Sequence, residues 1–494
     1  MNPRLLVELL PPIVERDRVT VAWRMSEPNP WQSVDAFFLR YEGLDLSIFD
    51  PRLFVEIFLA YELKVLRAHD GPVTVTLPLA IPHTVATFWR AYHDADNVEI
   101  EPLLPTDAYE PLSISPARPL PPRPIGVFYG GGKDSLSTAL ALREISDPSA
   151  MLMIAFCNPI GPSPRTARLL SERQETWQLR PARERLGVAT QLIYTDYQAH
   201  FHQHALHLRL NVELYSAGAL PALIAHGVEV ATLCRDRLEF PIVEGADGVP
   251  SFVSPRSRPE YYRAVSGHLR RHLGLRLDLT NLNYLFTGAL SLRLLADRFP
   301  EQSRMQVKCM SLRTTDRWCL ECGKCRSNVH GSLFAGIVDD DFDYDRIVRS
   351  HPGIDRVLAY LETEPPRNRF GNALFHDDVG DRYHAMGHYH NWAGADLSLL
   401  AGRISPAAMS RLERMRNGYG NHAFPVLETL SRRSAAQLAH PLADRLNAFL
   451  AQTFQLVDAL PGKRLVRDAD ADWAEARDLP LRAELAALAD PDRP

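Results

Sequence analysis

The chain lacks the features that would place it in a membrane or on a polyanion. None of its apolar stretches is long enough to span a bilayer, and its first residues contain no signal-like apolar core before Glu8. The 55 basic and 60 acidic residues leave a formal charge of −5, so no general field attracts nucleic acid. Internal repeats and low-complexity tracts are also missing. These absences predict a cytoplasmic protein with no membrane partner and no bulk nucleic-acid partner.

Prolines divide the chain. They are too frequent in residues 111–124 for a helix or a strand, which predicts a stiff linker. Before it, residues 1–110 mix strand-like and helix-like runs and predict a smaller N-terminal α/β domain. After it, residues 125–335 predict a second domain, and residues 336–494 favour a mainly helical C-terminal region that forms a cap or an oligomerisation surface. We therefore expect several domains and allow for a homo-oligomer.

The second predicted domain alternates strand-like with helix-like segments. These are Ile125 to Tyr129, Leu136 to Ile145, Met151 to Phe156, Arg165 to Leu186, Val188 to Tyr194, His204 to His226 and Val228 to Cys234. This order predicts an α/β fold with a parallel sheet that is wound with helices on both faces. Such sheets bind ligands beyond the carboxyl ends of their strands, so we expect the site at that edge.

A glycine loop follows the first of these strands. Gly130, Gly131 and Gly132 precede Lys133, Asp134 and Ser135, and a helix-like stretch begins directly afterwards. Glycines expose backbone N–H groups, and the positive end of a helix dipole attracts phosphate oxygens. The loop therefore predicts a nucleotide site. The alternative is a strand-to-helix turn without a ligand, but an acidic residue in an anion cradle favours a phosphate that carries a cation.

Two common nucleotide loops do not fit this sequence. A Walker loop needs Ser or Thr directly after Gly-Lys, where Asp134 stands, and the third glycine of a dinucleotide fingerprint is replaced by Ser135. The loop instead resembles Ser-Gly-Gly-x-Asp-Ser of the PP-loop ATP pyrophosphatase superfamily, with Gly130 at the place of the first serine. That family has an adenine nucleotide alpha hydrolase-like fold and cleaves ATP between its α and β phosphates, typically to adenylate a substrate oxygen.

The resemblance assigns roles to single residues. Asp134 would hold Mg²⁺, and Ser135 with the loop amides would bind the departing pyrophosphate. The nucleotide-binding set would comprise Gly130, Gly131, Gly132, Lys133, Asp134, Ser135, Phe156 and Cys157, the last two at the end of the next strand. The resemblance also favours Asp236 or Glu239, after a later strand, as residues that face nucleotide and substrate, so Asp134, Asp236 and Glu239 are the catalytic candidates. A solvated charged loop is the alternative reading of residues 235–239.

Four cysteines gather in the last part of the second domain. They are Cys309, Cys319, Cys322 and Cys325, in a chain with only six cysteines. Two-residue gaps let thiolates turn inward on one metal, and four sulfurs complete a tetrahedral Zn²⁺ shell without an open position. The pattern predicts a structural zinc site. An iron–sulfur cluster could use the same ligands, and a disulfide pair is disfavoured in a reducing compartment. Cys157 and Cys234 stand apart in apolar runs, as buried small residues do.

The C-terminal region carries a second group of metal-ligand residue types. His376, His384, His388 and His390 lie close together, and His384 and His388 would share one face of a helix. Gly387 disfavours a helix there, and no helical glutamate accompanies the pair. Scattered loop histidines are therefore the favoured interpretation.

The order of motifs carries a closer resemblance. A cysteine followed nine residues later by Trp318-Cys319-x-x-Cys322-Gly-Lys-Cys325 is similar to the zinc-binding set of the 7-cyano-7-deazaguanine synthases. The additional N-terminal domain, the Gly-Gly-Gly-Lys-Asp-Ser loop and Trp318 look more like the family of ATP-dependent UDP-N-acetylmuramoyl-L-alanyl-L-glutamate epimerases, over about residues 30 to 340. This resemblance implies an AMP-forming isomerase of peptidoglycan biosynthesis that uses ATP, Mg²⁺ and structural zinc.

The implied chemistry is coherent, but alternatives remain open. An acyl adenylate removes the charge of a carboxylate, so the neighbouring α-proton becomes acidic enough for a base to remove. The sequence does not single out that base or its partner acid. A PP-loop enzyme that adenylates a nucleobase, a tRNA or a carboxylate for ligation or nitrile formation would use the same loop and cysteines. An ATP-binding sensor would bind the nucleotide without releasing pyrophosphate.

Overall fold

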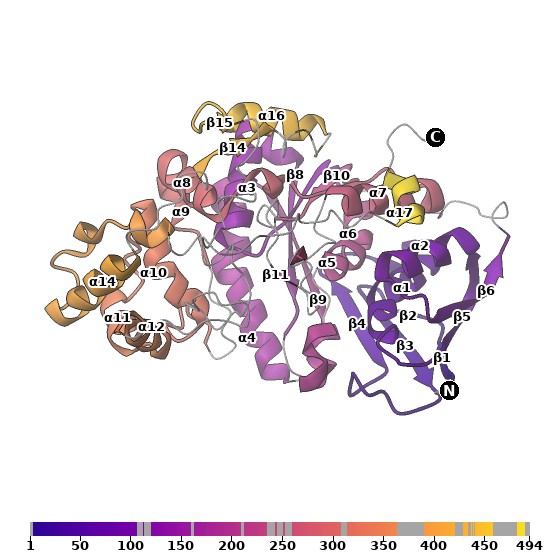
Figure 1. The fold of residues 1–494 in the computed structure, drawn as a ribbon. Coiled ribbons are helices and arrows are strands. Elements are labelled where there is room, and N and C mark those ends of the chain that lie inside the picture. Colours follow the sequence, from indigo (N-terminus) through magenta and orange to yellow (C-terminus); the bar gives the residue numbers. More distant parts are fainter. Residues whose placement is uncertain are drawn as a thin grey trace.

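A long, mostly parallel sheet flanked by helices organises the protein (Figure 1). The computed structural model describes residues 3–105, 112, 120–159, 163–208, 212–234, 243–244, 250–251, 259–307, 314–362, 390–419, 428–432, 436, 438, 440–457 and 482–489. The sheet has 11 strands in the order β13-β10-β7-β8-β9-β4-β3-β1-β5-β6, with β2 paired to β3. The strands are β1 (Leu5–Leu9), β2 (Ile13–Val14), β3 (Arg18–Met25), β4 (Ala36–Tyr41), β5 (Val73–Pro82), β6 (Val98–Leu104), β7 (Ile125–Phe128), β8 (Met151–Cys157), β9 (Ala189–Thr195), β10 (Val230–Thr232) and β13 (Asp278–Thr280).

Five strands at one end of the sheet are parallel, and the direction in which the chain adds them reverses at β7. The chain runs outward from β7 through β8 to β9, then returns to the other side of β7 for β10 and β13. Strands on the two sides of such a reversal send their connections to opposite faces, which leaves a crevice beyond the carboxyl ends of β7 and β10. The order therefore favours the end of β7 as the position for a ligand.

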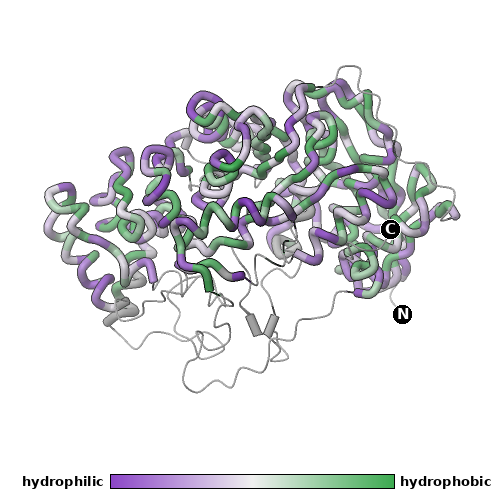
Figure 2. Tube along the Cα trace, turned by 90° about the horizontal axis from the view of Figure 1, so that it is seen from above, coloured by the Kyte–Doolittle hydropathy of each residue, from purple (hydrophilic) through white to green (hydrophobic). Residues whose placement is uncertain are grey.

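Helices cover both faces of this part of the sheet. Val127 of β7 packs in a core formed with α3, α8 and α16, whereas Phe128 packs in a core formed with α1, α2, α5, α6, α7 and α17. Side chains of a strand alternate between the faces, so one buried strand contributes to both cores. Figure 2 shows hydrophobic (green) and hydrophilic (purple) residues interspersed along the Cα trace. The covering helices are α1 (Arg52–Leu66), α2 (His83–His93), α3 (Lys133–Ile145), α4 (Pro164–Gln174), α5 (Val212–Gly218), α6 (Leu220–Ala225), α7 (Pro259–Leu273), α8 (Gly288–Arg298), α9 (Pro300–Ser303), α16 (Pro441–Leu450) and α17 (Ala483–Ala489).

The N-terminal strands extend the same sheet. Strand β4 pairs antiparallel with β9, with Arg40 opposite Tyr194 and its guanidinium carbon 4.1 Å from the centre of that ring. The backbone N–H of Phe38 donates to Asp196, just beyond β9, at 2.9 Å. Sheet and core therefore continue across the predicted boundary at residues 111–124, of which residues 112 and 120–124 are described.

A third core forms at the far end from the N-terminal strands (Figure 1). It contains Trp318 and Cys325 together with side chains of α10 (Gly323–Ala335), α11 (Tyr344–Ser350), α12 (Pro352–Glu362) and α14 (Pro406–Tyr419). Two short pairs complete the described elements, β11 (Val243–Glu244) with β12 (Pro250–Ser251) and β14 (Leu430–Ser431) with β15 (Leu456–Val457).

The α/β architecture agrees with the sequence prediction, whereas some elements differ. The predicted helix from His204 to His226 is broken into a 3-10 turn (Gln203–Leu208), α5 and α6. The predicted helix to Leu186 widens after α4 into π-helical segments, Glu175–Leu179 and Ala182–Leu186. Among the described residues no helix combines the length and the apolar character needed to cross a membrane.

Glu62 is an ionisable side chain in the core around α1. It is 1 % exposed, and Gln32 Nε2 donates to its Oε1 at 3.3 Å. Burial raises the pKa of Glu62 to about 8, because bonds from Gln32 and Tyr197 offset the lost hydration only in part. The carboxyl is therefore neutral in the fold at pH values where it is ionised in the unfolded chain.

We expect Glu62→Gln to flatten the pH dependence of stability. The unfolded carboxyl ionises near 4.5 and the folded one near 8, so the free energy of unfolding of the wild type falls as pH rises between these values. Glutamine keeps the shape and has no proton to lose. In urea unfolding, the free energy of unfolding of Glu62→Gln relative to that of the wild type should be higher at pH 8 than at pH 5. For Glu144→Gln, at an exposed position of α3, this difference should be the same at both pH values. Parallel pH profiles for Glu62→Gln and the wild type would contradict this account.

Candidate functional site

The glycine loop lies at the reversal point of the parallel strands. Strand β7 ends at Phe128, α3 begins at Lys133, and Tyr129 to Gly132 connect them. The Tyr129 N–H still bonds to the Ile154 carbonyl of β8 at 2.7 Å, so the sheet holds the loop up to that residue. The loop therefore leaves the sheet at the position where the strand order favours a ligand.

The three glycines meet different surroundings. Gly131 has a φ of +72°, and a Cβ there would lie 2.8 Å from the Gln178 side chain. A Cβ at Gly130 or Gly132 would meet no atom within 4 Å. Gly131 thus needs glycine for its conformation and for the close approach of Gln178, whereas its neighbours border open space. One side of the loop is packed and the other is accessible to a ligand.

A hydrogen bond from a distant segment orients the loop. The Val307 N–H donates to the Gly131 carbonyl at 2.7 Å. In a trans peptide the carbonyl and the following N–H point in opposite directions. The Gly132 N–H therefore points away from Val307. Gly132 is also the N-cap of α3 and brings no capping side chain, so the amides of the first turn remain suited to an anion.

Charged and hydroxyl side chains stand at the first turn of α3. Lys133 Nζ and Asp134 Oδ1 are 2.5 Å apart, with side chains 22 % and 27 % exposed. Ser135 is 6 % exposed, and its hydroxyl donates to the Gly132 carbonyl at 3.3 Å. An ammonium suited to phosphate and a carboxylate suited to a divalent cation thus lie side by side at the helix N-terminus.

The end of β8 lies next to the strand that leads into the loop. The Phe156 ring packs edge-on against Tyr215, with ring centres 5.2 Å apart, and its carbonyl accepts a bond from Gln174 Nε2 at 2.7 Å. The Cys157 thiol is buried and donates to the Ala167 carbonyl at 3.6 Å. Burial raises the pKa of Cys157 to about 12, although Arg40 acts in the opposite sense. Cys157 is thus a neutral thiol in this conformation and a poor base.

On the other side of β7, Cys234 follows strand β10. Burial raises the pKa of its thiol well above the usual range, and the Asp134 carboxylate adds to the shift. Behind it, Thr138 of α3 donates to Asn283 Oδ1 at 2.9 Å. The groups next to Asp134 on this side of β7 are thus uncharged.

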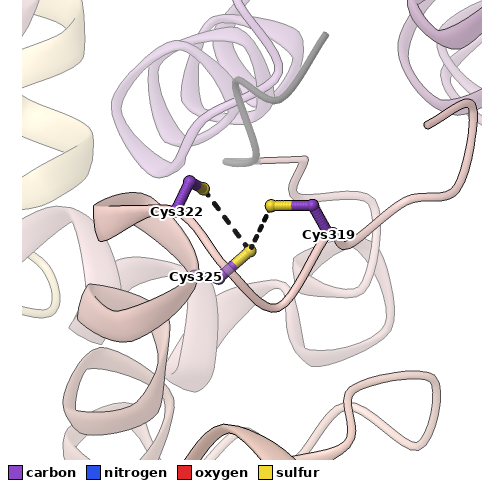
Figure 3. Close-up of side chains that lie close together, drawn as sticks. All are labelled: Cys319, Cys322 and Cys325. Carbon is purple, nitrogen blue, oxygen red and sulfur yellow. Dashed lines mark hydrogen bonds between the residues drawn. The ribbon is translucent and has the colours of Figure 1, made fainter. Parts of the chain in front are cut away.

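Three of the four predicted cysteine ligands meet at the start of α10 (Figure 3). The Cys325 sulfur lies 3.9 Å from that of Cys319 and 3.6 Å from that of Cys322. Leu320 takes a positive φ of +59°, which turns the chain between the first two cysteines, and the Glu321 N–H donates to the Cys319 sulfur at 3.4 Å.

The sulfur spacing fits a single tetrahedral metal ion. With Zn–S bonds of about 2.3 Å, neighbouring sulfurs of a tetrahedron lie about 3.8 Å apart. A four-iron cluster binds each thiolate to a different iron and would need wider spacing, and a disulfide would bring two sulfurs to about 2.05 Å. The cluster could therefore hold a metal such as zinc. The predicted fourth ligand, Cys309, lies outside the described residues.

A buried arginine connects this cysteine cluster with the turn that orients the glycine loop. The Arg317 guanidinium contacts both carboxylate oxygens of Asp339, at 3.1 and 3.0 Å. It also donates to the carbonyls of Gln306, at 3.1 and 3.0 Å, and Arg304. Cys319 follows two residues after Arg317, and Val307 follows directly after Gln306. The same turn is thus bonded to the glycine loop on one side and to the cysteine segment on the other.

Other predicted residues fall elsewhere. Asp236 and Glu239 lie outside the described residues, as do His376, His384 and His388. His390 contacts Glu428 at 2.9 Å, and Arg293 bonds to the same carboxylate. Sequence reasoning missed Gln178, Val307 and Arg317. Only Arg317 had a nearby signal, its position beside the Trp318-Cys319 pair.

Comparisons with protein-family models, with curated proteins and with solved structures found no match.

We expect Cys322→Ser to release the metal. Loss of one thiolate breaks the tetrahedral shell, and metal binding to such sites is coupled to folding by an apparent 10 kcal/mol or more, roughly. Elemental analysis should find little metal in the variant, with reduced solubility or a lower midpoint of thermal unfolding. Cys157→Ser, the same change outside the cluster, should keep the metal. Metal-free wild type that is soluble and stable would argue against the site. Bound iron with a visible absorption band would instead indicate an iron–sulfur cluster at these cysteines.

Proposed function

We propose that the protein binds ATP at the loop of residues 130–135 and cleaves it between the α and β phosphates. The observation that carries this proposal is a glycine loop with Gly131 at positive φ, packed on one side and open on the other, at the reversal point of a parallel sheet. Oriented amides at a helix N-terminus bind phosphate oxygens without large rearrangement. The loop sequence resembles that of the PP-loop pyrophosphatases, which supports pyrophosphate as the leaving group.

The side chains of the first turn of α3 have complementary roles in this proposal. Asp134 would hold Mg²⁺, which neutralises charge on the phosphates, while Lys133 and Ser135 contact their oxygens. Pyrophosphate would leave along the helix N-terminus, where its charge is stabilised. The cysteine cluster would bind Zn²⁺ through Cys309, Cys319, Cys322 and Cys325. The zinc would have a structural role, because four thiolates leave no open coordination position on the metal.

The finer proposal is an epimerase that acts through an acyl adenylate. A substrate carboxylate oxygen attacks the α-phosphorus of ATP, and pyrophosphate leaves. The adenylated carbonyl then accepts electron density when a base removes the α-proton, and an acid returns a proton to the opposite face. Water releases AMP and restores the carboxylate. The resemblance to the epimerase family points to the terminal L-glutamate of UDP-N-acetylmuramoyl-L-alanyl-L-glutamate or a related peptide, and to a role in peptidoglycan biosynthesis.

Product analysis tests the nucleotide chemistry. Protein incubated with ATP, Mg²⁺ and the peptide substrate should release AMP and pyrophosphate in equal amounts. Asp134→Asn should lower the rate by at least about a hundredfold, because the cation loses a charged ligand. Glu144→Gln, which also turns a carboxylate into an amide but at the other end of α3, should leave the rate unchanged. Release of ADP and phosphate would overturn the proposal, and binding of ATP without turnover would favour a sensor.

Isotope exchange tests the epimerisation. Every turnover passes through a carbanion that can take its proton from solvent, so reaction in D₂O with ATP and Mg²⁺ should place deuterium at the α-carbon of the terminal glutamate in the epimerised product. Without ATP, configuration and label should stay unchanged. If AMP accumulates while the terminal residue keeps its L configuration, another nucleophile captures the adenylate, and a ligase or a nitrile-forming enzyme is the better assignment.

A further inference from the structure

We propose that Arg317 is a positioning residue that sets the orientation of the phosphate-binding amides from the cysteine cluster. The inference rests on the proposed binding of ATP at the glycine loop. It goes further by assigning the orientation of that loop to Arg317, which lies beside the cysteine cluster and not in the loop or its helix.

The contacts form a continuous series. Arg317 holds the carbonyls of Arg304 and Gln306, and the next residue, Val307, donates its N–H to the Gly131 carbonyl. That bond fixes the peptide between Gly131 and Gly132, so the Gly132 N–H is directed away from Val307, and Gly132 itself borders open space because a Cβ there would meet no atom within 4 Å. If the turn shifts, this peptide can rotate and the amide leaves the cradle.

The Arg317 side chain has little freedom to do anything else. It is 8 % exposed and held by Asp339, and the backbone carbonyl of Arg317 accepts a bond from Arg173 Nη2 at 3.0 Å. A guanidinium donates in several directions of one plane, which lets a single side chain hold a carboxylate and two backbone carbonyls together. A lysine ammonium keeps the charge but cannot reproduce that arrangement. Arg317→Lys therefore separates the charge from the geometry.

The experiment compares two ligands on the full chain. The probes are α,β-methylene ATP with Mg²⁺, which cannot be cleaved at the proposed bond, and adenosine, which has no phosphate. In Arg317→Lys we expect the affinity for the ATP analogue to fall about tenfold, with metal content and adenosine affinity unchanged. The matched control is Asp341→Asn, because Asp341 pairs with the same guanidinium at 3.5 Å but its side chain is 71 % exposed, so water screens most of that interaction. This control should bind both ligands like the wild type.

The outcomes separate the two proposals. A folded, metal-loaded Arg317→Lys that binds the ATP analogue with wild-type affinity overturns the role of Arg317 while leaving nucleotide binding intact. A wild type that does not bind the analogue overturns the proposed function itself, and the role of Arg317 falls with it. Equal loss for adenosine and the analogue would mean a general structural defect, which also overturns positioning.

Amide exchange keeps the inference testable if Arg317→Lys does not fold. In the wild type the Val307 amide should exchange slowly because it is bonded to Gly131. Asp339→Asn removes the charge that holds the guanidinium and should speed exchange at Val307 with the metal retained, whereas Asp341→Asn should not. Unchanged protection of Val307 in metal-loaded Asp339→Asn would overturn the proposal.

Discussion

The hydrogen bond from Val307 to the Gly131 carbonyl joins the glycine loop to the segment that carries the cysteine cluster. Gly131 lies at the end of the central strand β7, whereas Val307 belongs to a turn that Arg317 holds from the side of the cysteine cluster. The sheet itself fixes the loop only up to Tyr129, so the direction of the peptide between Gly131 and Gly132 depends on this bond together with the packing of Gln178 and the start of α3. The shape of the open side of the loop therefore depends on residues more than 170 positions away in the chain.

Local chemistry explains which features could be predicted from sequence. A glycine run between an apolar strand and a helix-like stretch marks a strand-to-helix turn, so residues 125–145 predicted the position of the loop, although α3 begins at Lys133 and not at the predicted Leu136. The location at the carboxyl edge followed from the alternation of strands and helices over residues 125–234. The cysteine spacing likewise restricts the thiols of Cys319, Cys322 and Cys325 to one side of a short turn. Both patterns involve only a few consecutive residues, whose relative positions are restricted by the local backbone conformation.

Long-range contacts account for what the sequence did not predict. The antiparallel pairing of β4 with β9 joins residues more than 150 positions apart, and strand periodicity carries no information on which strand becomes the neighbour. Gln178 and Arg317 likewise take their places through contacts that tertiary folding creates. The break of the predicted helix from His204 to His226 is a related case, because its apolar spacing continues although Pro221 starts a new helix within it.

The pairing of β4 with β9 also gives the sheet two opposite polarities. Strand β3 runs in the same direction as β9, so the connection from β3 to β4 lies at the edge of the glycine loop, where Gln32 pairs with Phe201 and Ser33 bonds to His200. Strands β1, β5 and β6 run the other way, and their carboxyl ends face the opposite edge. The N-terminal strands therefore reach the edge of the glycine loop through the connection from β3 to β4 and through the segments that lead into β5 and β6, where Trp31 packs edge-on against His69. The carboxyl ends of β1, β5 and β6 lie at the opposite edge of the sheet, so residues that follow these strands cannot line the open side of the loop.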